Sequence, residues 1–162
     1  MEINYESVKS LGILVHPSSL PGGTYCGTFG KCLEDWIDTL SRHRITTWQF
    51  LPLSPTDSTG SPYSSPSSFA LNPWLIDVDE LQQNKYISKQ DSFEEIRKGS
   101  EVLNYFDFKI ADTLSKKIGD LLLDEWKYQS DHNKDLFSKW ISKNTWVEDY
   151  SIFMSLKDEF CN

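Results

Sequence analysis

The feature that most constrains the fold is a strand–helix–strand pattern at the start of the chain. Residues 11–15 form a short, continuous apolar run, which is typical of a strand buried on both faces. Residues 31–43 place apolar side chains on one helical face, and residues 45–53 are β-branched and aromatic before they end near a proline. A strand, a helix and a second strand make a βαβ unit, which requires parallel strands and a right-handed crossover.

The remainder of the chain has a mainly helical pattern. Asp77 is expected to cap a helix, and no element is predicted over residues 82–103. From residue 105 to about residue 128, apolar side chains recur every four positions, which predicts a long amphipathic helix. A short helix is expected over residues 136–141 and a last one over residues 145–160.

The chain therefore divides into two predicted parts, and its fold class is α/β. Residues 1–81 form the βαβ portion with a long loop, and residues 82–162 form a mainly helical subdomain. Two parallel strands do not make a stable sheet alone, because their edges stay unpaired and their faces need covering. Either the helices cover this small sheet, or further strands belong to a longer protein.

The charge balance argues against two classes of partner. The chain carries 16 lysines and arginines against 24 aspartates and glutamates, a formal net charge of -8. Nucleic acids and anionic membrane surfaces both need clustered positive charge, so neither is expected as a partner. No apolar run approaches the roughly 18 residues of a membrane span, and residues 1–10 lack the basic start and apolar middle of a signal peptide.

Neither the cysteines nor the glycines predict a metal or a cofactor. Cys26, Cys32 and Cys161 are an odd number without metal-ligand spacing, so we expect reduced thiols in a cytoplasmic protein. The glycines within residues 22–30 follow a strand, where a dinucleotide fingerprint is found, but their spacing is wrong for one. The acid expected at the end of the second strand is also absent from residues 50–52. These glycines are expected to serve turns and close packing.

The second strand leads into a long loop that carries candidate binding groups. Residues 54–73 are rich in serine and proline, and loops at strand ends are where α/β proteins place binding residues. Tyr63 follows Pro62, which fixes the backbone before it, so the tyrosine ring and hydroxyl would suit stacking on a sugar. From spacing alone, packing of the same ring against the core is an equal alternative.

Two other candidate residues favour a structural interpretation. His16 directly follows the first strand, and a lone histidine is more often a structural hydrogen-bonding group than a catalyst. Asp57 and the loop serines are expected to serve in turns. Glycoside chemistry usually needs two carboxylates about 5–9 Å apart, and the strand-end loops offer no such pair.

Four segments resemble one enzyme family in sequence and in order. They are GILVHPSSLPG (residues 12–22), WQFLPLSPT (48–56), GSPYSSPSSFALNPWLIDVDEL (60–81) and TWVEDYSIFMSLKDEF (145–160). These segments are similar to the start of the amylomaltases, the 4-alpha-glucanotransferases of glycoside hydrolase family 77. Because the segments are long, ordered and spread over nearly the whole chain, the resemblance is specific.

The resemblance implies a (β/α)₈ TIM barrel, of which this chain would hold the first two parallel strands and a mainly helical insertion. It implies an enzyme of starch and glycogen metabolism that transfers segments of α-1,4-glucans between maltooligosaccharides with retention, without a metal or other cofactor. The family's catalytic acids lie beyond the matched region, so no catalytic residue is assigned. The implied substrate-binding residues are Tyr63, stacked on the sugar next to the cleaved bond, Ser61 beside it, and Asn72, which would shape the pocket.

Three positions depart from the family pattern and indicate a diverged member. Thr28 stands where the family has an aspartate, and Ser54 and Leu71 each replace a glycine. The leading hypothesis is a 4-alpha-glucanotransferase whose first portion, as this chain alone, is inactive. The alternative is a stand-alone α-glucan-binding or interaction protein, which the retained loop around Tyr63 favours. A structural helical domain without sugar contact is a third possibility.

Overall fold

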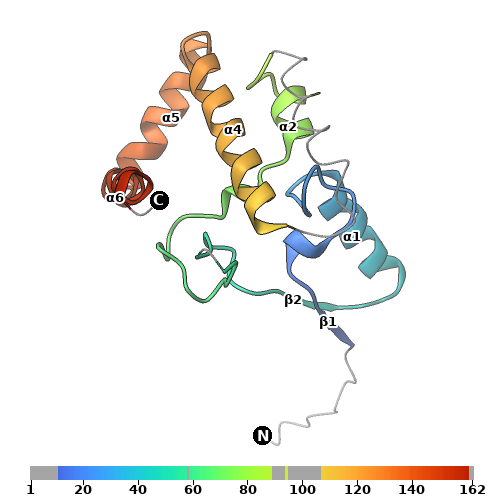
Figure 1. Cartoon of the computed structure of the whole chain (residues 1–162). Helices are drawn as coiled ribbons and strands as arrows, with labels where there is room; N and C mark the ends of the chain where they lie inside the picture. Colours follow the sequence, from blue (N-terminus) through green and yellow to red (C-terminus); the bar gives the residue numbers. More distant parts are fainter. Residues whose placement is uncertain (1–10, 58, 89–93, 95–106, 161–162) are drawn as a thin grey trace, which may run out of the picture.

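A computed structural model describes residues 11–57, 59–88, 94 and 107–160 of the chain. Its parts are a small sheet with one helix, a group of longer helices, and the loops that connect them (Figure 1). The predicted helix start at residue 105 lies outside the described residues, as does Cys161. None of the described helices is both long enough and apolar enough to cross a membrane.

The predicted βαβ unit is confirmed. β1 (Gly12–Leu14) and β2 (Thr47–Gln49) pair in parallel, and α1 (Lys31–Arg42) connects them. β2 is shorter than the predicted strand over residues 45–53, because the chain leaves the ladder after Gln49 and runs into the long loop. The parallel pairing places the ends of both strands, and the loops that follow them, on the same side of the sheet.

The expectation that the first strand is buried on both faces is wrong. Ile13 lies opposite Trp48, and α1 covers this side through Trp36, whose ring centroid lies 6.2 Å from that of Trp48. The side chain of Leu14, in contrast, is 59% exposed. Within the part of the chain that the structure describes, the sheet has two strands, so each strand keeps one edge without a neighbour.

Two short 3₁₀ turns and a short helix connect the sheet to the longer helices. η1 (Pro17–Ser19) follows β1, and η2 (Pro73–Leu75) precedes α2 (Val78–Gln83). Asp77 caps α2 as predicted, because its Oδ1 accepts the N–H of Glu80 at 3.0 Å.

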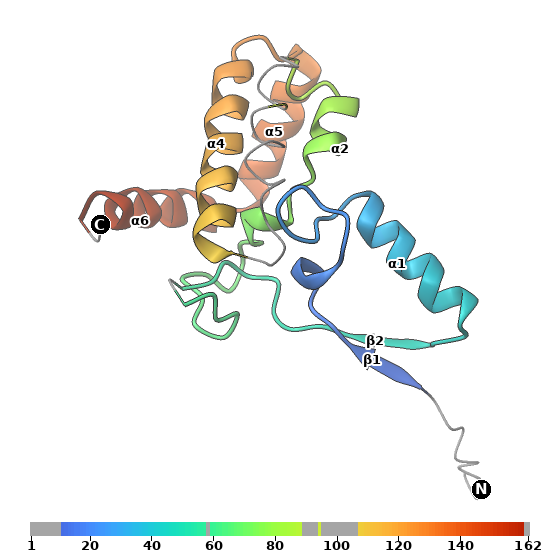
Figure 2. The same ribbon diagram turned by 45° about the vertical axis from the view of Figure 1, so that its right-hand side comes forward.

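Three longer helices follow, α4 (Phe108–Trp126), α5 (Asp131–Lys143) and α6 (Trp146–Phe160). α4 and α5 form a hairpin, and α6 leaves the far end of α5 at a steep angle (Figure 2). α6 agrees with the predicted helix over residues 145–160.

The predicted short helix over residues 136–141 is wrong in extent, because α5 begins at Asp131. The hydroxyl of Ser130 accepts the N–H of Asn133 at 3.2 Å and caps the helix there. The polar residues of the first turn are tolerated because α5 buries no side chain completely.

The core lies between the loop after β1, η2, α2 and α4. Trp74 stacks on Phe108 with 5.7 Å between ring centroids, and Ala111 and Ile118 on the same helix are fully buried. Core residues come from both sides of the predicted boundary at residue 81, so the two parts share one core; the boundary itself stays a prediction. The buried cluster consists of Tyr25, Cys26, Trp74, Val78, Ile87, Ala111, Leu114 and Ile118.

A buried hydrogen bond joins the loop after β1 to α2. The hydroxyl of Thr28, which is fully buried, donates to Oδ2 of Asp77 at 2.5 Å, while the other carboxylate oxygen caps α2. Gly30 lies against the same carboxylate and leaves no room for a Cβ atom. Asp77 therefore links two segments 49 residues apart as well as starting its own helix.

Replacement of Asp77 by alanine should lower the free energy of unfolding by about 1–3 kcal/mol, because α2 loses its cap and the buried Thr28 hydroxyl loses its acceptor. Urea unfolding followed by far-UV circular dichroism measures this difference. Asp120→Ala, on an exposed position of α4, is the matched control and should change stability little. Equal stability of the two variants would contradict the linking role of Asp77.

Candidate functional site

The long loop after β2 is closed at its base by Asn72. The N–H of Asn72 donates to the carbonyl of Leu53 at 2.8 Å, which brings the two ends of the loop together. Its Oδ1 accepts the N–H of Trp74 at 3.0 Å and caps η2. Asn72 is only 4% exposed, so it shapes the base of the loop rather than its outer surface.

Asp57 organises the first half of the loop, which confirms the predicted turn role. Its Oδ1 accepts hydrogen bonds from the Thr59 N–H at 2.9 Å, the Thr59 hydroxyl at 2.6 Å and the Ser61 N–H at 3.1 Å. Its carbonyl accepts the N–H of Gly60 at 3.0 Å. The Thr59 hydroxyl, followed by the Ser61 amide, holds the pKa of the Asp57 carboxyl below its usual value, because these donors favour the charged form.

Tyr63 lies on the outside of this loop. Its N–H donates to the hydroxyl of Ser61 at 3.3 Å, and its side chain is 74% exposed. The alternative in which the ring packs against the core is therefore wrong for this structure. A ring presented in this way offers a face and a hydroxyl to a ligand.

The second half of the loop is held by serines and by a ring contact. The hydroxyl of Ser67 accepts the N–H groups of Phe69 and Ala70 at 3.1 and 3.0 Å, so this serine has the predicted turn role. The ring of Phe69 stacks on that of Trp146 in α6, with 5.8 Å between centroids and 20° between planes. This contact ties the loop to the helical part of the chain.

A second contact ties the loop to α4. Gly60 has φ of +77°, and a Cβ atom at this position would lie 2.3 Å from the ring of Phe108. Glycine adopts this backbone conformation without strain and allows the close approach of the ring. The loop is therefore held at both ends of its middle section, by Phe108 near Gly60 and by Trp146 near Phe69.

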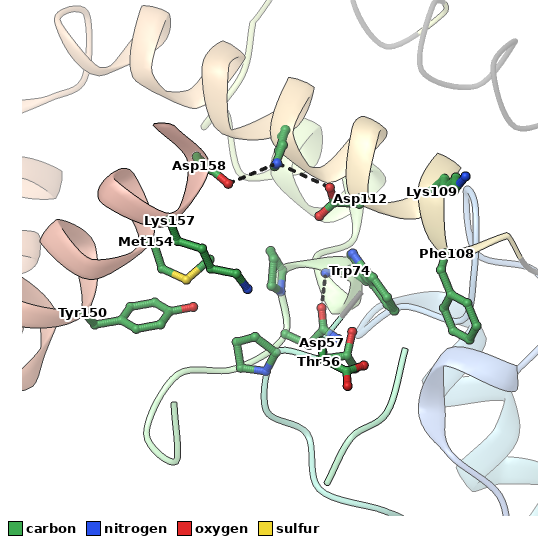
Figure 3. A pocket seen from close by; sticks show the side chains of 14 residues that line it. Thr56, Asp57, Trp74, Phe108, Lys109, Asp112, Tyr150, Met154, Lys157 and Asp158 are labelled. Carbon is green, nitrogen blue, oxygen red and sulfur yellow. Dashed lines mark hydrogen bonds and ion pairs between the residues drawn. The ribbon is translucent and has the colours of Figure 1, made fainter. Parts of the chain in front are cut away.

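A cleft of about 340 Å³ lies between the base of the loop, η2, α4 and α6 (Figure 3). Lys116 bridges its two helical walls, since its ammonium lies 3.4 Å from both Asp112 in α4 and Asp158 in α6. The fourteen lining residues include Asn72 but neither Tyr63 nor Ser61.

The three predicted binding residues are thus divided by the structure. Asn72 lines the cleft, whereas Tyr63 and Ser61 lie on the loop outside it. Residues of α4 and α6 in the cleft wall, such as Phe108 and Tyr150, were not predicted as site residues. Their spacing only predicts helices, and nothing in the sequence places them opposite the loop.

His16 has the structural role expected of it. Its Nδ1 lies 3.2 Å from the donating N–H of Ser18, and its Nε2 lies 3.3 Å from the carbonyl of Pro52, so the ring joins the segments that follow β1 and β2. Partial burial lowers the pKa of His16, which favours the neutral ring that these two contacts need.

The described residues offer no metal site and no reactive thiol. No group of three or more histidine, cysteine, aspartate or glutamate side chains within residues 11–57, 59–88 and 107–160 is arranged to hold a metal ion. Cys26 and Cys32 are buried and free, and burial raises the pKa of Cys26 to about 12. A thiol with so high a pKa is a poor nucleophile at neutral pH.

Comparison with known proteins gives one consistent family. A family model described as 4-alpha-glucanotransferase matches residues 15–162. The 4-alpha-glucanotransferase of Clostridium butyricum is 38% identical over 154 residues, which are 90% of this chain and 29% of that protein. The enzyme of the same name from Thermus thermophilus is 31% identical over 154 residues, 94% of this chain and 29% of that protein.

A solved structure agrees with these relatives. The amylomaltase from Streptococcus agalactiae, determined in complex with acarbose, superposes with a TM-score of 0.78 at 29% identity. The superposition covers 93% of this chain and 30% of that one. The chain therefore spans about a third or less of the length of the proteins that it matches.

Replacement of Gly60 by alanine should destabilise the fold by about 1–3 kcal/mol, because the new Cβ strains a left-handed backbone and collides with Phe108. Thermal unfolding measures the effect, and near-UV circular dichroism reports the stacked Trp74 and Phe108 rings. Gly119→Ala in α4 is the matched control, since a Cβ there meets nothing within 4 Å and alanine favours a helix. If both variants gain stability, the contact with Phe108 does not hold the loop.

Proposed function

The chain belongs to the 4-alpha-glucanotransferase family, and from this membership we propose that it forms the sugar-binding start of a (β/α)₈ barrel enzyme that transfers α-1,4-glucan segments between maltooligosaccharides. The observation that carries the proposal is the family match over residues 15–162, together with an exposed Tyr63 on an ordered loop. Because parallel strands place their following loops on one side, β1 and β2 would direct this loop toward the catalytic face of such a barrel.

Tyr63 would provide the platform on which a glucose ring stacks. The ring of a tyrosine combines a flat apolar face with a hydroxyl, and at 74% exposed this one is accessible. Ser61 would act beside it, since its hydroxyl already holds the Tyr63 N–H. Asn72 would contribute by fixing the base of the loop, in agreement with its burial and its hydrogen bonds to Leu53 and Trp74.

The chemical step would be a retaining transfer, in which a carboxylate forms a glycosyl-enzyme intermediate and a second sugar hydroxyl resolves it. In the family, the acids for this step lie beyond the region that resembles this chain. We therefore assign binding residues and no catalytic residue to residues 1–162. The buried free thiols of Cys26 and Cys32 support a cytoplasmic location, where thiols stay reduced.

A second candidate function is α-glucan binding without catalysis by this chain alone. The observation that favours it is that the described residues include several contacts that hold the Tyr63 loop. They are the base closure at Asn72 and the contacts with Phe108 and Trp146.

The purified 162-residue chain should not convert maltotriose into longer and shorter maltodextrins, because the described residues offer binding groups without the family's catalytic acids. Thin-layer or anion-exchange chromatography of the sugars after long incubation measures this. A relative such as the Clostridium butyricum enzyme is the positive control. Disproportionation by the purified chain would overturn the conclusion that residues 1–162 contribute binding residues and no catalytic residue.

Maltoheptaose should bind the chain, and Tyr63→Ala should weaken the affinity about tenfold or more, because stacking on the ring is lost. Isothermal titration calorimetry measures the dissociation constants, and Tyr63→Phe should keep most of the affinity. Tyr128→Ala is a matched control, since Tyr128 is 72% exposed at the end of α4 and away from the loop. An equal loss with both alanine variants would mean that Tyr63 is not the platform.

A further inference from the structure

We propose that Asp57 is a positioning residue for the sugar-binding face of Tyr63. Its carboxylate fixes the backbone of residues 59–63 and thereby positions the Tyr63 ring in the free protein, before a glucan binds. This inference rests on the proposed function, because it assigns to Asp57 the preorganisation of the same binding site.

The side chain of Tyr63 does not fix its own position. It is 74% exposed, and within the described part of the chain it takes part in no hydrogen bond or ring contact. An exposed ring without partners samples several rotamers, and each rotamer that binding excludes costs affinity. The backbone that carries the ring must therefore supply most of its positional order.

A two-step relay of hydrogen bonds connects Asp57 to that backbone. Oδ1 of Asp57 accepts the N–H of Ser61 at 3.1 Å, and the hydroxyl of Ser61 accepts the N–H of Tyr63 at 3.3 Å. Pro62 lies between the two steps and restricts the backbone by its ring. A change at Asp57 is thus transmitted to Tyr63 through a short, stiff segment.

Oδ1 of Asp57 accepts three hydrogen bonds within this turn, and the turn also contacts α4. The same Oδ1 also accepts the N–H and the hydroxyl of Thr59, so a single acceptor orders three donors. Gly60, at the centre of this turn, lies against Phe108 of α4. In Figure 3, Asp57 lies on the loop wall of the cleft and Lys157 on the α6 wall. The turn from which the relay starts therefore contacts α4 through Phe108.

The contacts with Thr59 and Ser61 need an acceptor oxygen at the Oδ1 position of residue 57, and they do not need its negative charge. An asparagine side chain keeps an oxygen at the Oδ1 position and can still accept from Thr59 and Ser61. An alanine removes every side-chain contact of the turn. The conservative variant is therefore expected to rescue the function that the alanine variant loses.

Amide hydrogen exchange of the full chain, followed by NMR, tests the relay directly. Asp57→Ala should speed exchange at Thr59, Ser61 and Tyr63 about threefold to tenfold, with α4 unchanged. The Tyr63 amide is decisive, because it donates to Ser61 and not to Asp57. Asp57→Asn should restore slow exchange, and Asp120→Ala should change none of these amides. Unchanged exchange at Tyr63 in Asp57→Ala overturns the proposal.

Binding of maltoheptaose then tests the consequence for the site. Asp57→Ala should weaken binding about threefold to tenfold, and Asp57→Asn should weaken it less. In a Tyr63→Ala background, Asp57→Ala should cause no further loss, because its effect passes through the ring. The same loss in both backgrounds would overturn the positioning role.

Separate results test the positioning role of Asp57 and the glucan platform at Tyr63. Loss of binding in Tyr63→Ala with no effect of Asp57→Ala refutes the positioning role and leaves the glucan platform intact. Absence of binding by the wild-type chain refutes the platform and, with it, the role of Asp57 in sugar binding. Exchange at the Tyr63 amide still decides in that case whether the relay exists.

Discussion

The hydrogen bond from the buried Thr28 hydroxyl to Asp77 is the contact on which the arrangement of this chain depends. It joins the loop after β1 to the start of α2, at the side of the core that contains Trp74 and Val78. The residue at position 28 matters because the resembled family has an aspartate there. In this chain the threonine hydroxyl donates to the Asp77 carboxylate, so a hydrogen bond makes the contact between the two segments.

The site is built by a loop that depends on distant helices. Its base is closed by Asn72, its first half is ordered by Asp57, and its middle is held by Phe108 and Trp146. Exposed loops are usually more mobile than the helices and strands that they connect. A binding loop therefore needs rigid contacts that hold its side chains in place. Here α4 and α6 supply contacts of that kind, through Phe108 and Trp146.

The sequence predicted those helices and strands that depend on residues within a single segment. The βαβ unit, the Asp77 cap and α6 follow from apolar spacing and from capping chemistry, which a single segment contains. The sequence did not predict the start of α5, because Ser130 and Asp131 read equally well as a polar loop. The predicted burial of β1 was wrong. Whether a strand is buried depends on which other segments pack on it, and the sequence of the strand alone does not show this. For the same reason, spacing around Tyr63 could not decide between an exposed ring and a packed one. The cleft was also not predictable, because Asp57, Lys116 and Asp158 come from distant segments.

Within the described residues, the sheet and the loop that follows it differ in how they are packed. Two of the three residues in each strand are exposed, whereas Ile118 in the core is fully buried. The Tyr63 loop follows β2 in sequence, but its contacts with Phe108 and Trp146 assign it to the cooperative unit of the helices. In energetic terms, the Tyr63 loop belongs with the helices that follow it in the sequence.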